Sequence, residues 1–84
     1  MTTFIYKETY PVGTQVRICD LPALEDFRRS WKLHTPLQPF MLAFAGRLAV
    51  VDKVGFYHGG DQLYVLRDVP GVWHEVCLMP AADK

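Results

Sequence analysis

The feature that most constrains this chain is a series of short β-type runs in its second half, each ended by turn residues. One run covers residues 46–54, a glycine turn follows at Gly59-Gly60, and further runs cover residues 62–67 and 73–79. Short runs separated in this way are typical of a small barrel or sandwich. We therefore expect a mainly β fold whose interior is filled by its own side chains, which leaves little room for a buried active site.

Length and composition predict one packed domain over residues 1–84. The chain is 50% hydrophobic and 21% charged, which suits a globular core rather than disorder. Nine basic residues balance nine acidic ones. A formal net charge of zero gives no electrostatic footprint for nucleic acid or an anionic membrane, and it weakens the repulsion that opposes self-association.

The sequence predicts a cytoplasmic protein. No stretch is long and apolar enough to span a bilayer, and residues 1–7 lack the features of a secretion signal. Two cysteines, Cys19 and Cys77, are too few for a disulfide framework, and we expect both to be reduced.

The first half of the chain predicts one strand and one helix after an N-terminal arm or edge strand over residues 1–11. Residues 14–19 alternate cleanly and predict a strand with Val16 and Ile18 on one face. Asp20 is placed to cap a helix over residues 23–31, with Pro22 in its first turn.

A loop is predicted over residues 32–39, and two structures are open for residues 40–44. This apolar run suits a short buried helical turn or the start of a strand, and periodicity does not decide between them. The next β-rich run, residues 47–54, loses its alternation, which indicates a bulge or burial on both faces.

The last third predicts a hairpin and a closing strand. Tyr64 and Leu66 are expected on one face of a strand over residues 62–67, and Pro70-Gly71 is expected to be a turn. The final strand is expected over residues 73–79, with Val76 and Leu78 on one face and Glu75 and Cys77 on the other.

These residues resemble a known pattern, the SH3-like barrel of nitrile hydratase β subunits, with a looser similarity to the Mind bomb/HERC2 domain. The matching motifs are Gly13-x-x-Val16-x-Ile18, Phe44-Ala45-Gly46-Arg47-x-x-x-Val51, Leu63-Tyr64-Val65-x-Arg67 and Val72-Trp73-x-Glu75. The resemblance covers residues 12–79 and implies a partly open barrel of about five strands with a helical insertion between the first two main strands. It does not imply catalysis, since the metal of nitrile hydratase is held by a Cys-rich motif of the other subunit, and this chain has no such motif.

No grouping of residues in the sequence predicts catalysis, a metal or a cofactor. The resemblance implies that the strands carrying Cys19 and Cys77 pair, which would make the two thiols neighbours. Three interpretations are then open: a redox disulfide, half of a metal site, or two small apolar fillers. The histidines His34, His58 and His74 are scattered. On a strand, His74 and Glu75 would point to opposite faces and form no acid–base pair.

Two aromatic groups are candidate binding sites for a partner. In the first, Arg28, Arg29 and Lys32 are interleaved with Phe27 and Trp31. Arginine with aromatic residues suits stacking on a base or on a partner's side chain. The alternative is a helix that packs its apolar face on the barrel and leaves the arginines in water.

The second group is Tyr57, Tyr64 and Trp73, which are expected around the mouth of the barrel, where peptides dock in such folds. The alternative is that Trp73 closes the barrel as part of its core.

The leading hypothesis is a non-enzymatic module that binds another protein or forms a homodimer. Surplus apolar residues near the surface favour it; candidates are Phe4, Tyr6, Phe40, Phe44 and Phe56. One alternative is an accessory protein for a metallohydratase, suggested by the resemblance alone. The other is a nucleic-acid-binding barrel that uses Arg17, Arg28, Arg29, Lys32 and Arg47.

Overall fold

A computed structural model describes residues 9–32, 35–57 and 61–81 of the chain. The predicted N-terminal arm or edge strand over residues 1–11 lies largely outside the described residues, and the predicted glycine turn at Gly59-Gly60 lies wholly outside them. The elements, in chain order, are β1 Gln15–Ile18, α1 Leu21–Ser30, the 3-10 helix η1 Pro39–Phe44, β2 Leu48–Phe56, β3 Gln62–Leu66, β4 Val69–His74, the 3-10 helix η3 Glu75–Cys77 and β5 Leu78–Pro80.

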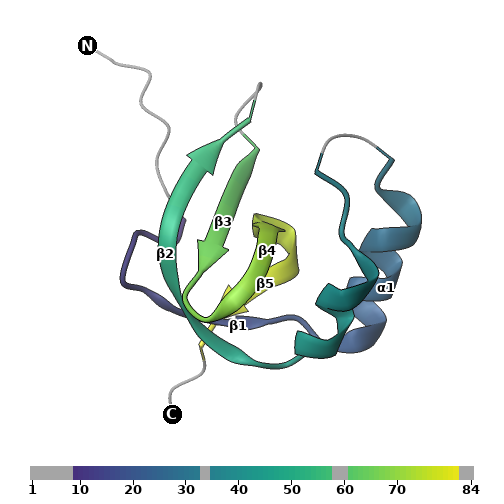
Figure 1. The fold of residues 1–84 in the computed structure, drawn as a ribbon, viewed down its shortest axis with the longest axis horizontal. Coiled ribbons are helices and arrows are strands. Elements are labelled where there is room, and N and C mark those ends of the chain that lie inside the picture. Colours follow the sequence, from purple (N-terminus) through teal and green to yellow (C-terminus); the bar gives the residue numbers. More distant parts are fainter. Residues whose placement is uncertain (1–8, 33–34, 58–60, 82–84) are drawn as a thin grey trace.

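The five strands form one antiparallel sheet in the order β4-β3-β2-β1-β5. The fold is therefore mainly β, with a short helix between the first two strands, as the sequence predicted (Figure 1). The first and last strands pair, with Ile18 opposite Leu78.

Strand β2 is long and curved, and it joins the two halves of the sheet (Figure 1). Its residues 48–50 pair with β1, while residues from Val51 onward pair with β3. The register shifts between Val51 and Lys53, which leaves Asp52 as an extra residue on β2. This is a bulge, one of the two explanations that the lost alternation left open, and a bulge increases the bend of its strand.

The core lies on the concave side of the sheet. Val16 and Ile18 of β1 are fully buried, as the alternation predicted. Tyr64 and Leu66 of β3 face the same core, and Tyr64 is paired directly with Trp73 of β4.

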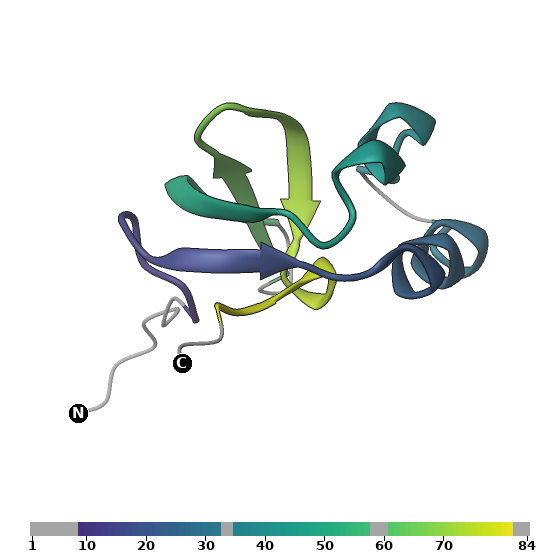
Figure 2. The ribbon, with the colours of Figure 1, turned by 90° about the horizontal axis from the view of Figure 1, so that it is seen from below.

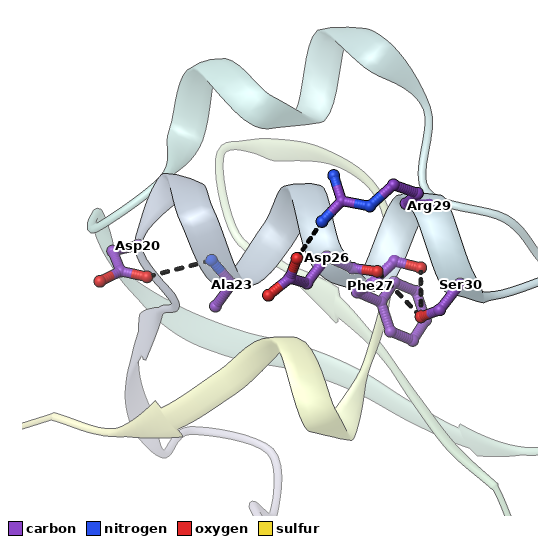
Figure 3. A network of polar contacts seen from close by, with 6 residues as sticks. All are labelled: Asp20, Ala23, Asp26, Phe27, Arg29 and Ser30. Atoms are coloured by element: carbon purple, nitrogen blue, oxygen red, sulfur yellow. Dashed lines mark hydrogen bonds and ion pairs between the residues drawn. The ribbon is translucent and has the colours of Figure 1, made fainter.

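Helix α1 begins and ends close to the predicted bounds. The Asp20 side chain accepts a hydrogen bond from the Ala23 amide at 3.3 Å, and Pro22 lies in the first turn (Figure 3). At the other end the Trp31 amide donates to the Phe27 carbonyl at 2.8 Å. Leu24 is the buried residue of the helix.

Residues 40–44 are part of a 3-10 helix, which decides between the two structures that the sequence left open. Helices α1 and η1 lie together at one side of the sheet in both views (Figures 1 and 2). Met41 of η1 is buried in the core, whereas Phe40 is 50% exposed, so part of the apolar surplus does lie at the surface. Phe44 and Phe56 are half-buried, and Phe4 and Tyr6 lie outside the described residues.

The prediction of a turn at Pro70-Gly71 is wrong. The chain reverses at Arg67 and Asp68 instead, where Asp68 has a φ of +63°. The register jumps from Val65 opposite Val72 to Leu66 opposite Val69, so Pro70 and Gly71 are extra residues inside β4. A bulge in an edge strand accommodates proline because no ladder hydrogen bond is lost there.

The prediction of one strand over residues 73–79 is also wrong. Strand β4 ends at His74, η3 occupies residues 75–77, and β5 starts at Leu78 in the other half of the sheet. A 3-10 helix repeats every three residues rather than every two. Cys77 is therefore buried beside Leu78, and Val76, predicted to share the face of Leu78, is 68% exposed.

Candidate functional site: a pocket beside Trp31

A small open pocket lies where the end of α1, the start of β3 and η3 meet. Its volume is about 120 Å³, and it is lined by Trp31, Asp61, Gln62, His74, Glu75 and Val76. Sites for drug-sized ligands have volumes of about 300–1,000 Å³. This pocket therefore has room for the end of one side chain rather than for a typical metabolite.

One wall of the pocket is an aromatic cluster. The rings of Phe27 and Trp31 are stacked, with their centroids 5.2 Å apart and their planes at 17°. The His74 ring is tilted against both, at 4.9 Å from Phe27 and 4.8 Å from Trp31. The helical spacing of Phe27 and Trp31 brings them onto one face of α1, and His74 at the end of β4 fixes that face to the sheet.

His74 holds the cluster in place through a polar contact. It is buried, and its Nε2 lies 2.8 Å from the Thr35 carbonyl oxygen. Since a carbonyl oxygen only accepts, this nitrogen carries the proton and donates. The bond ties the chain after α1 to the end of β4, so His74 acts here as a structural residue.

Two other lining residues, Gln62 and Glu75, belong to a hydrogen-bond network with the N-terminal segment. The Thr9 hydroxyl donates to Glu75 Oε2 at 2.9 Å, and the Thr9 amide donates to Gln62 Oε1 at 2.8 Å. The Tyr64 hydroxyl donates to Gln62 and accepts from the Tyr10 amide at 3.2 Å. Two lining side chains, Gln62 and Glu75, are thereby oriented by residues far from them in sequence.

The predicted partner-binding residues do not form one site. Trp31 is half-buried and lines the pocket, and Tyr57 is 41% exposed. Tyr64 and Trp73 are buried in the core, which corrects their interpretation as side chains of an open groove and selects the alternative of a core Trp73.

Arg28 and Arg29 are exposed on α1. Arg29 forms an ion pair with Asp26 of the same helix (Figure 3). For the first aromatic group, the alternative interpretation therefore holds: Phe27 packs against the protein and the arginines lie in water. Neither arginine lines the pocket.

Sequence reasoning missed the pocket residues other than Trp31. The prediction that His74 and Glu75 lie on opposite faces is wrong, because the strand ends between them and both line the pocket. Consecutive burial of Trp73 and His74, which breaks the alternation, is seen only in the folded chain, so the sequence carried no signal for these residues. The other two histidines, His34 and His58, lie outside the described residues.

Cys19 and Cys77 are buried free thiols at neighbouring positions. The Cys19 amide donates to the Cys77 carbonyl at 2.9 Å, and Cys19 Sγ lies 3.7 Å from the Val76 carbonyl. Burial raises the pKa of the Cys77 thiol to about 12, and Cys19 adds to the rise. Burial, then Asp20, raises the pKa of the Cys19 thiol. These raised pKa values disfavour the thiolate that disulfide exchange needs, so both residues act as apolar fillers.

We expect Cys77 to make the folded chain less stable at alkaline pH. The pKa of a free cysteine is about 8.5, so between that pH and about 12 the unfolded chain has lost a proton that the folded chain keeps. Stability then falls by up to about 1.4 kcal/mol per pH unit in this window from this thiol. Urea unfolding at pH 8 and pH 10.5 should show a smaller loss in Cys77→Ala than in the parent chain, and equal losses would contradict the assignment.

Within residues 9–32, 35–57 and 61–81, no group of three or more His, Cys, Asp or Glu side chains could hold a metal ion. Nor does any helix in this part of the chain have the length and apolar character to cross a membrane. Comparison with protein families, with curated proteins and with solved structures gave no match.

Proposed function

We propose that this chain is a non-enzymatic module that binds another protein chain through the pocket beside Trp31. The proposal rests on the side chains that line this small pocket together: the Trp31 indole, the 68% exposed Val76, and the polar groups of Gln62 and Glu75. An aromatic anchor beside exposed apolar surface is the composition found at the centre of protein interfaces.

The rigidity of the pocket supports the proposal. Trp31 is held by Phe27 and His74, and Glu75 by Thr9, so little side-chain entropy is lost when a partner docks. A lining of this kind suits recognition of a protruding side chain.

The partner in the simplest version of the proposal is a second copy of the chain. The register places Leu48 and Met79 on either side of Arg17, on the outer face of the sheet, and both are at least 40% exposed. These two exposed apolar side chains lie outside the pocket lining, and together with a net charge of zero they favour self-association through this face. The metallohydratase-accessory hypothesis stays a prediction from the resemblance.

Nucleic acid is a weaker candidate because its expected contacts are in part engaged within the chain. Arg17 donates to the Gly46 carbonyl at 2.9 Å, Arg29 pairs with Asp26, and Arg47 lies over the Phe44 ring at 5.4 Å.

Selection from a displayed library of random peptides tests the protein-binding function. We expect enriched peptides to lose at least about tenfold in affinity for Trp31→Ala, the size of effect typical of an aromatic hot spot. Val76→Ser removes apolar surface at a 68% exposed position without adding a charge, and it should weaken them as well. Phe40→Ala removes an exposed aromatic side chain outside the pocket and should change nothing.

Two outcomes would overturn the proposal: no peptide enriched above background, or enriched peptides that bind Trp31→Ala and Val76→Ser as well as the parent chain. Sedimentation of the parent chain alone, at rising concentration, separates a second copy from a different partner.

A further inference from the structure

The charge of the pocket differs from that of the chain as a whole. Among the described residues that line it, Asp61 and Glu75 are carboxylates, and none is a lysine or an arginine. An anionic or phosphorylated group would meet two like charges there, whereas a cation would be attracted by both.

The indole of Trp31 adds to this preference. Trp31 lines the pocket, and the stacking of Phe27 on its ring holds the indole in position. The face of an aromatic ring carries partial negative charge, and tryptophan attracts a cation more strongly than tyrosine or phenylalanine.

Glu75 is built into the site rather than free to swing away. It is half-buried, and Thr9 holds Oε2 at 2.9 Å. An ionised carboxylate has about four lone-pair sites, so this one bond leaves acceptor capacity for a ligand. Gln62, which is also fixed by Thr9, supplies an amide beside it.

We propose that this pocket receives the cationic end of an arginine or lysine side chain from the partner. The inference rests on the protein-binding function proposed above and names the chemistry of its anchor. The volume of about 120 Å³ suits a guanidinium or ammonium group with part of its stem. The apolar side chain of Val76 at the rim is placed to pack against such a stem.

The two tryptophans provide a direct measurement. Trp31 lines the pocket and Trp73 is buried in the core. In a nitrogen–proton NMR spectrum, the indole N–H signal of Trp31 therefore reports binding at the pocket, and that of Trp73 serves as an internal control. Acetyl-arginine amide and acetyl-lysine amide are titrated in, beside acetyl-citrulline amide, which is close to arginine in shape but uncharged. We expect a saturable shift of the Trp31 signal with both cations, at least about fivefold weaker affinity for citrulline, and weaker binding in high salt.

A charge-neutralising variant tests the role of the carboxylate. Glu75→Gln keeps the shape and the acceptor oxygen for Thr9, and it should weaken arginine binding by about two- to fivefold. Glu25→Gln removes the same charge from an exposed position of α1 outside the pocket and should have no effect. Thermal unfolding of both variants verifies that they are folded.

The inference is overturned if citrulline shifts Trp31 as strongly as arginine, if neither cation shifts it, or if Glu75→Gln binds like the parent chain. It fails separately from the proposed function. If the enriched peptides depend on Trp31 but contain no lysine or arginine, the protein-binding function would stand and the proposal of a cationic anchor would be wrong.

Discussion

Replacing Leu24 by alanine is expected to destabilise the chain by about 2–5 kcal/mol, as for other large-to-small changes in a close-packed core. Leu24 is fully buried and is the buried residue of α1, so the change leaves a cavity between the helix and the sheet. The total stability of a domain is about 5–15 kcal/mol, and a chain of 84 residues is a small domain. The loss is therefore a large fraction of the total.

The effect should reach the pocket as well, since Trp31 directly follows α1 as its C-cap residue. A helix that is attached only through the Phe27, Trp31 and His74 rings would hold the indole less firmly. Urea unfolding measures the stability. Leu21→Ala is the matched control, because it makes the same change in the same helix at a side chain that is 43% exposed. Equal losses in the two variants would show that α1 is not packed through Leu24.

The parts of the fold that the sequence predicted are those decided by neighbouring residues. Alternation placed Val16 and Ile18 in the core, and Asp20 with Pro22 marked the start of α1. Each of these depends on backbone geometry within a few positions, where local preference and tertiary packing agree.

The pocket could not be predicted in this way because its walls come together only in the folded chain. Residue 31, residues 61–62 and residues 74–76 are far apart in sequence, and the 3-10 geometry of η3 decides which of them face one another. Trp73 and Tyr64 illustrate the same limit. Their residue types suit a partner surface or a core equally well, and the cross-strand pairing of the two places them in the core.

The turn that was wrongly predicted at Pro70-Gly71 is a bulge in β4, and this bulge makes Gly71 sensitive to substitution. Proline and glycine occur at chain reversals and also at bulges, and the prediction considered only the reversal. The bulge brings Gly71 against η1. A Cβ added to Gly71 would lie 2.9 Å from Met41 Cε and 3.1 Å from Met41 Sδ, and Gly71 has a φ of +100°.

Gly71→Ala is expected to cost about 2–5 kcal/mol, from about 1–3 kcal/mol of backbone strain and about 1–3 kcal/mol of overpacking. Met41 is buried in the core, so its side chain has little room to move aside. Gly46→Ala is the matched control, since Gly46 has a φ of +78° with open space around its Cβ position and should show the strain alone. Adding Met41→Ala completes a double-mutant cycle in which the contact appears as an interaction energy. If Gly71→Ala and Gly46→Ala lose the same stability and the cycle shows no coupling, β4 does not pack on η1 through this glycine.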